Sequence, residues 1–254
     1  MSGAIVRATG GTVGLIVLAE LASRTGLVPA LPPASRVLTR SVSLIGDRGF
    51  LTDVAATLGA WAGGLGAAVV VAVPLGVLFG RLPGLEVATR ALVGLFRRVP
   101  AVAAVPLAIA VLGAGTPMRI ALVCYAACRP ILIHTVSAVS DVDPVTTDTM
   151  RVFGLGPLGL LWWVALPKAA PSIFAGIRRA ASIGLIVTIG AELLSGGTHG
   201  IGVFLTRSQS TGGHPATLLA GALWAGLLGL AVDVAFVRAG RWLFRRHHAP
   251  EPAP

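Results

Sequence analysis

Three side chains that can carry charge or titrate lie inside apolar segments of this sequence. Arg129 and His134 share one segment, and Glu192 lies in another, GAELLSG. If these segments cross a membrane, a charge at mid-span costs about 2.5–3.5 kcal/mol on insertion scales, so such residues are candidates for a solute pathway. Arg129 could attract an anion such as a sulfonate. It could also snorkel, or pair with Glu192 or Asp233, and Glu192 could simply be wet at the outer end of its helix.

The sequence contains no pattern typical of an enzyme or of a metal centre. Cys124 and Cys128 share a helix face, but no further ligand lies nearby at metal-binding spacing, which favours small packing residues. No HExxH, GxSxG or GxxxxGK[ST] motif occurs. We therefore expect no catalytic, cofactor-binding or metal-binding residue, and no ATP binding by this chain.

The composition indicates a membrane protein. Of 254 residues, 55% are hydrophobic and only 12% are charged, against roughly 25% charged in soluble domains. The net charge of +10 does not indicate nucleic-acid binding, because the basic residues form no patch interleaved with aromatics. They lie instead at the ends of apolar segments, as in membrane proteins.

Apolar runs of about twenty residues predict an all-α protein with six transmembrane helices. The predicted spans are roughly 4–22, 54–79, 93–112, 118–139, 175–195 and 216–237. The second span carries Gly59, Gly63, Gly76 and Gly80, a spacing that lets helix backbones approach closely. Residues 241–254 form a tail that we expect to be disordered.

The basic residues also predict the orientation. With the N-terminus inside, thirteen flank the cytoplasmic ends of the spans and six flank the outer ends, Arg119 among the six. This bias predicts that both termini are cytoplasmic.

One segment between the fourth and fifth spans is too broken to cross. Residues 148–171 read DTMRVFGLGPLGLLWWVALPKAAP. The chain from Val142 to Phe153 is compatible with a helix that Gly154 caps, and Pro157 can open a second short helix that Pro167 closes. We therefore expect two short cytoplasmic helices joined by a glycine turn, which could present a surface to a partner. Asp148 and Arg151 could instead simply pair with each other.

This segment resembles the EAA loop of permeases of ABC (ATP-binding cassette) importers. That loop reads EAA, three residues, Gly, nine residues, Ile, one residue, Leu-Pro. Here Asp148-Thr149-Met150 is followed at the same spacings by Gly154, Val164 and Leu166-Pro167. Asp148 replaces Glu, Thr149 and Met150 replace the alanines, and Trp162-Trp163 stand where relatives often carry arginines.

Other segments resemble the nitrate/sulfonate/taurine branch of that superfamily, in unbroken order over about residues 31–245. They are LPPASRVL, FRRVPAVAAVPLAIAVLGAG, RPILIHTVSAVSDVDP and GAELLSGGTHGIGVFL. The resemblance implies a type I ABC importer permease fold, with an N-terminal helix within 1–30 and the permease domain within 50–240. It also implies a multi-pass protein of the bacterial inner membrane.

The resemblance further implies the partners. Two permeases, as a homodimer or heterodimer, would form the pathway for a small solute, together with two ATPase subunits that bind the ATP and an external solute-binding protein. The residues expected to dock the ATPase are Asp148, Thr149, Met150, Arg151, Gly154, Leu155, Pro157, Leu166 and Pro167. An ion-gradient-driven secondary transporter is the alternative, but the sequence shows neither inverted repeats nor paired broken helices.

Overall fold

The computed structural model describes residues 31–82 and 100–245, together with residues 11, 14, 17, 18 and 20–25. The described residues form helices and connecting turns, without strands. The helices are α2 (Ala34–Ile45), α3 (Arg48–Arg81), the 3-10 helix η1 (Ala101–Ala104), α5 (Val105–Leu112), α6 (Thr116–Ser140), α7 (Pro144–Val152), α8 (Pro157–Leu160), the π-helix η2 (Leu161–Ala165), α9 (Leu166–Ser195), α10 (Ile201–Ser210) and α11 (Pro215–Leu243).

Four helical stretches are long and apolar enough to cross a membrane: Arg48–Arg81, Thr116–Ser140, Pro157–Ser195 and Pro215–Leu243. They confirm the second, fourth and sixth predicted spans. The fifth span is longer than predicted, because its helix begins at Pro157 rather than near residue 175. The first predicted span and the start of the third lie largely outside the described residues, and the rest of the third is the short pair η1–α5.

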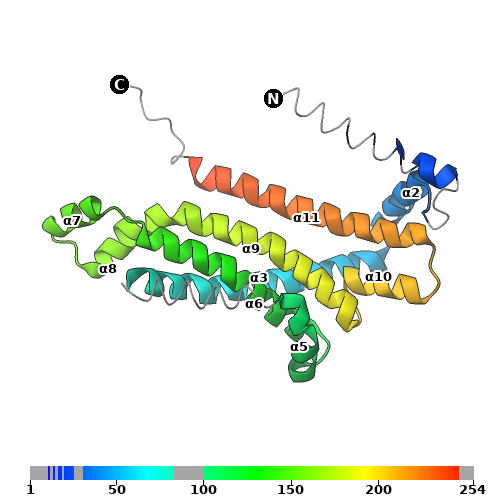
Figure 1. The fold of residues 1–254 in the computed structure, drawn as a ribbon, viewed down its shortest axis with the longest axis horizontal. Coiled ribbons are helices and arrows are strands. Elements are labelled where there is room, and N and C mark those ends of the chain that lie inside the picture. Colours follow the sequence, from blue (N-terminus) through cyan, green and yellow to red (C-terminus); the bar gives the residue numbers. More distant parts are fainter. Residues whose placement is uncertain are drawn as a thin grey trace.

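The long helices α3, α6 and α9 form the centre of the bundle, and α11 lies along α9 (Figure 1). The pair α7–α8 lies at one end of the bundle, and α2 and α10 lie at the other (Figure 1). The carboxylate of Asp47 starts α3 by accepting hydrogen bonds from the backbone N–H groups of Gly49 and Phe50. At about 1.5 Å per residue, α3 is roughly 51 Å long, which exceeds the hydrocarbon core of a bilayer.

Glycines set the close contact between α3 and α6, as predicted for Gly63, Gly76 and Gly80 but not for Gly59. The Cα of Gly76 faces Thr135, and that of Gly80 faces the carbonyl of Val136, with no room for a Cβ at either position. Gly64 packs equally tightly against Val123, whereas Gly59 faces open space. In lipid, the hydrophobic effect does not drive helices together, so their association depends on packing contacts, and glycines allow the two backbones to come close enough to make them.

We predict that Gly64→Ala destabilises the protein by about 1–3 kcal/mol, because its new methyl would lie 2.5 Å from the Cβ of Val123. The matched control is Gly59→Ala, which makes the same change of helix propensity in open space. Thermal unfolding of both variants in detergent measures the difference. Equal melting temperatures would contradict this account of the contact.

Candidate functional site

The α7–α8 segment forms two helices joined by a glycine turn, as predicted. The N–H of Gly154 donates to the carbonyl of Arg151 (2.9 Å) and that of Leu155 to the carbonyl of Met150 (3.1 Å), the pattern of a Schellman cap. Gly154 has φ of 85°, which a residue with a Cβ adopts only with strain. Glycine is therefore required at this turn by backbone geometry.

The prediction that Pro167 closes the second short helix is wrong. α8, η2 and α9 are continuous from Pro157 to Ser195. In the π turn the N–H of Leu166 reaches back five residues, to the carbonyl of Leu161. In a regular α-helix the ring of a proline clashes with the carbonyl four residues earlier. The wider π turn changes this spacing, so the helix continues past Pro167.

Apolar side chains cover the outer surface of this segment. Asp148 and Arg151 do form an ion pair (3.1 Å), but it is exposed and worth only a few tenths of a kcal/mol. The large apolar side chains that are exposed here are those of Val145, Met150, Val152, Phe153, Leu158, Trp162 and Trp163, with Trp163 80% exposed. An apolar patch of this kind marks a surface that another molecule covers.

Asp143 begins α7 with its side chain. Its carboxylate accepts hydrogen bonds from the backbone N–H of Val145 (3.0 Å) and from the hydroxyl of Thr146 (3.1 Å). The bond from Val145, and to a smaller extent that from Thr146, lowers the pKa of Asp143 below its ordinary value.

Basic side chains lie on α6 and α9 within the spanning helices, and two of them, His134 and Arg179, lie near each other. The Cβ of His134 packs against Gly176 of α9, and Arg179, one turn further along α9, lies close enough to His134 to interact electrostatically. Arg129 extends its guanidinium over the ring of Tyr125, 5.5 Å from its centroid. Arg129 and His134 are half-buried and Arg179 is exposed. The sequence pattern placed Arg179 among residues that flank the cytoplasmic ends, whereas it lies in the middle part of α9.

Glu192 belongs to a separate, closed cluster at the opposite end. It is fully buried, so it is not a wet interfacial residue. Its carboxylate accepts hydrogen bonds from the hydroxyl of Thr57 (2.9 Å), the guanidinium of Arg119 (3.3 Å) and the N–H of Gly202 (3.0 Å). The ion-pair partner of Glu192 is thus Arg119. Asp233 pairs with Arg178 (2.9 Å) and not with Arg129.

Sequence reasoning missed the other members of this outer cluster, which are Asp53, Thr57, Arg119 and His199. Asp53 is buried and accepts from the N–H of Gly200 (3.0 Å), and its carboxylate lies 3.3 Å from Nδ1 of His199. Arg119, predicted to flank a span in solvent, is buried and also donates to the carbonyl of His199 (2.7 Å). No local signal marks Asp53 as buried, because a charge at the end of an apolar run is usually solvated and its partners are distant in the sequence.

Comparison with known proteins shows that this chain is similar to permeases of transport systems. The family model described as "Binding-protein-dependent transport system inner membrane component" matches residues 69–247. The bicarbonate transport system permease protein CmpB of Synechocystis sp. is 28% identical over 233 residues, 88% of this chain and 83% of that protein. The taurine transport system permease protein TauC of Escherichia coli is 28% identical over 225 residues, 87% of this chain and 79% of that protein.

A nitrate import permease protein NrtB, from Leptolyngbya laminosa, is 30% identical over 132 residues, about half of each chain (52% and 47%). Among solved structures, a chain of the MetNI methionine ABC transporter in an inward-facing conformation superposes with a TM-score of 0.61. It is 23% identical, and the match covers 75% of this chain and 94% of that chain. This likeness shows a shared fold.

We predict that Arg119→Ala destabilises the protein by about 3–5 kcal/mol, because it leaves the buried carboxylate of Glu192 without its cation. The double variant Arg119→Met/Glu192→Met removes both charges and recovers most of the loss. Thermal unfolding in detergent measures both. A double variant less stable than Arg119→Ala alone would contradict the proposed compensation.

We also predict a pH dependence of α7. Because the pKa of Asp143 is lowered in the folded chain, its contribution to helix stability is present above the unfolded-state pKa and is lost as the pH falls through the lowered folded-state pKa. Hydrogen exchange of the first-turn amides of α7 measures it. In Asp143→Asn, which can still cap but does not titrate, this acid-induced loss of protection disappears.

Proposed function

The chain belongs to the family of binding-protein-dependent transport system inner membrane components, so it is the permease component of an ABC importer, and we propose that it imports a small anionic solute and couples to its ATPase through residues 144–167. The fold is that of a type I importer permease. In a permease the chain itself is not an enzyme, and ATP hydrolysis belongs to a separate subunit.

The apolar surface of the α7–α8 segment supports the coupling role. The patch from Val152 to Trp163 is exposed at one end of the bundle, and Gly154 fixes the turn between its two helices. The helix that runs on from this patch is continuous to Ser195. A push on the patch by an ATPase would therefore reach the spanning region without crossing a flexible joint. The ATPase docks on this patch, which faces the cytoplasm.

The same end of the bundle receives the C-terminal part of α11. Gly240 packs against Phe174, and the rings of Phe174 and Phe244 lie 5.7 Å apart. If the coupling segment is cytoplasmic, the C-terminal end of α11 is cytoplasmic too. This agrees with the orientation proposed from the distribution of basic residues.

The basic side chains of α6 and α9 support an anionic solute. Arg129, His134 and Arg179 lie partly open within the spanning helices, where contact with lipid would be costly. A second permease copy covers this face, and the cations line the pathway between the two copies. The bicarbonate, nitrate and taurine permeases that resemble this chain carry, by their names, solutes that bear an oxygen-rich anionic group.

The single observation that carries the coupling role is the exposed tryptophan pair. We predict that Trp163→Glu lowers solute-stimulated ATP hydrolysis about tenfold or more in a complex reconstituted with its ATPase and binding protein, because a charge replaces a central apolar contact. The control is Trp242→Glu at the end of α11, where the tryptophan is equally open (73% exposed). Equal hydrolysis by the two variants would place the ATPase elsewhere.

A further inference from the structure

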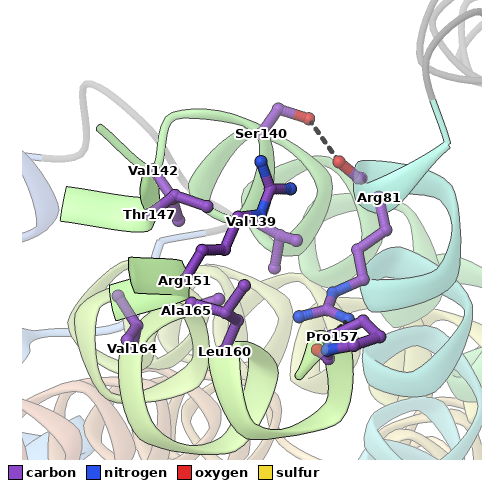
Figure 2. A pocket seen from close by; sticks show the side chains of 11 residues that line it. Arg81, Val139, Ser140, Val142, Thr147, Arg151, Pro157, Leu160, Val164 and Ala165 are labelled. Atoms are coloured by element: carbon purple, nitrogen blue, oxygen red, sulfur yellow. Dashed lines mark hydrogen bonds between the residues drawn. The ribbon is translucent and has the colours of Figure 1, made fainter. Parts of the chain in front are cut away.

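A cavity of about 360 Å³ lies where the coupling segment joins the spanning helices (Figure 2). Its walls come from the ends of α3 and α6 and from α7, α8 and η2. The lining residues that matter here are Arg81, Ser140, Thr147, Arg151 and Pro157.

The cavity is basic. Among the described residues, its lining includes two guanidinium groups and no carboxylate. Figure 2 shows Arg81 and Arg151 entering from opposite walls, one from the end of α3 and the other from α7. Arg81 donates one bond, to the carbonyl of Pro157 (2.9 Å), and Arg151 one, to Asp148 (3.1 Å). Since a guanidinium carries five N–H donors in a planar fork, both retain donors for an anion.

The depth of the cavity in the membrane follows from α3. The rise from Asp53 to Arg81 is about 42 Å at 1.5 Å per residue, which matches the roughly 40–45 Å of a bilayer with its headgroups. Asp53 contacts His199, whose side chain is 54% exposed, and we assign this end of α3 to the headgroup level of one leaflet. Arg81 therefore lies at the level of the headgroups of the other leaflet.

We propose that this cavity binds the phosphate group of an anionic phospholipid. Headgroup phosphates lie at the depth of Arg81, and a phosphate oxygen pair suits the guanidinium fork. One phosphate between Arg81 and Arg151 would join the end of α3 to α7, and so would hold the coupling segment against the spanning helices. The proposal depends neither on the solute nor on the ATPase contact.

The test is lipid retention by the purified full-length protein, measured by native mass spectrometry after exchange into mixed phosphatidylglycerol and phosphatidylcholine. The wild-type protein retains phosphatidylglycerol in preference to phosphatidylcholine. Arg81→Gln lowers that retention about tenfold or more, as expected for the loss of a charge-assisted phosphate contact, and Arg81→Lys keeps part of it. Arg241→Gln, which removes an exposed arginine from the end of α11, is the matched control and leaves the retention unchanged.

Folding of Arg81→Gln is checked by its circular dichroism and gel-filtration profile against those of Arg241→Gln. Equal retention by wild type and Arg81→Gln would overturn the proposal. So would a second result: thermal stabilisation of delipidated protein by inorganic phosphate that Arg81→Gln abolishes, without any preference for phosphatidylglycerol. That result would assign the cavity to a soluble anion instead of a lipid.

Discussion

The buried carboxylate of Glu192 ties together the elements at the end of this permease that lies opposite the α7–α8 segment. Glu192 belongs to α9. Its carboxylate accepts a hydrogen bond from the hydroxyl of Thr57 on α3 and from a backbone N–H at the start of α10, and it forms an ion pair with Arg119 on α6. A buried charge is tolerable only when such partners surround it, so each of these elements is fixed relative to the others. The buried Glu192 side chain also explains the glycines at positions 200 and 202. A Cβ at Gly200 or Gly202 would lie 2.5 or 2.6 Å from a Glu192 atom, so only glycine lets the chain approach the carboxylate.

A rigid outer end changes where movement can occur during transport. With α3, α6 and α9 joined by the Glu192 cluster at one end and by glycine contacts along their length, they behave as one block. Among the open surfaces are the side chains of Arg129, His134 and Arg179 and, at the other end of the bundle, the α7–α8 segment. If two copies assemble and couple as proposed, alternating access is a motion of one permease copy against the other, driven at the α7–α8 segments.

The continuity of the helix from Pro157 to Ser195 connects the two ends. A π turn at Leu161–Ala165 lets the helix continue past Pro167. The coupling segment is therefore the first part of a membrane-spanning helix rather than a loop hung between two of them. The basic cavity lies beside this junction, so an anion bound there would act on the angle between α7 and the bundle.

The sequence by itself determined the membrane class, three of the described spans and the glycine turn at Gly154, because these depend on local composition and on backbone geometry within a few residues. Its motif spacing also identified the family. It could not reveal that Arg119 and Asp53 are buried, since each lies at the end of an apolar run and reads as a solvated flanking charge. Their partners, Glu192 and the loop at His199–Gly202, are between 70 and 150 residues away in the chain. Likewise Pro167 carries a local stop signal that the wider π turn overrides. Only the packing of α3, α6 and α9 decided these points, because the energy of a buried charge depends on which distant groups surround it.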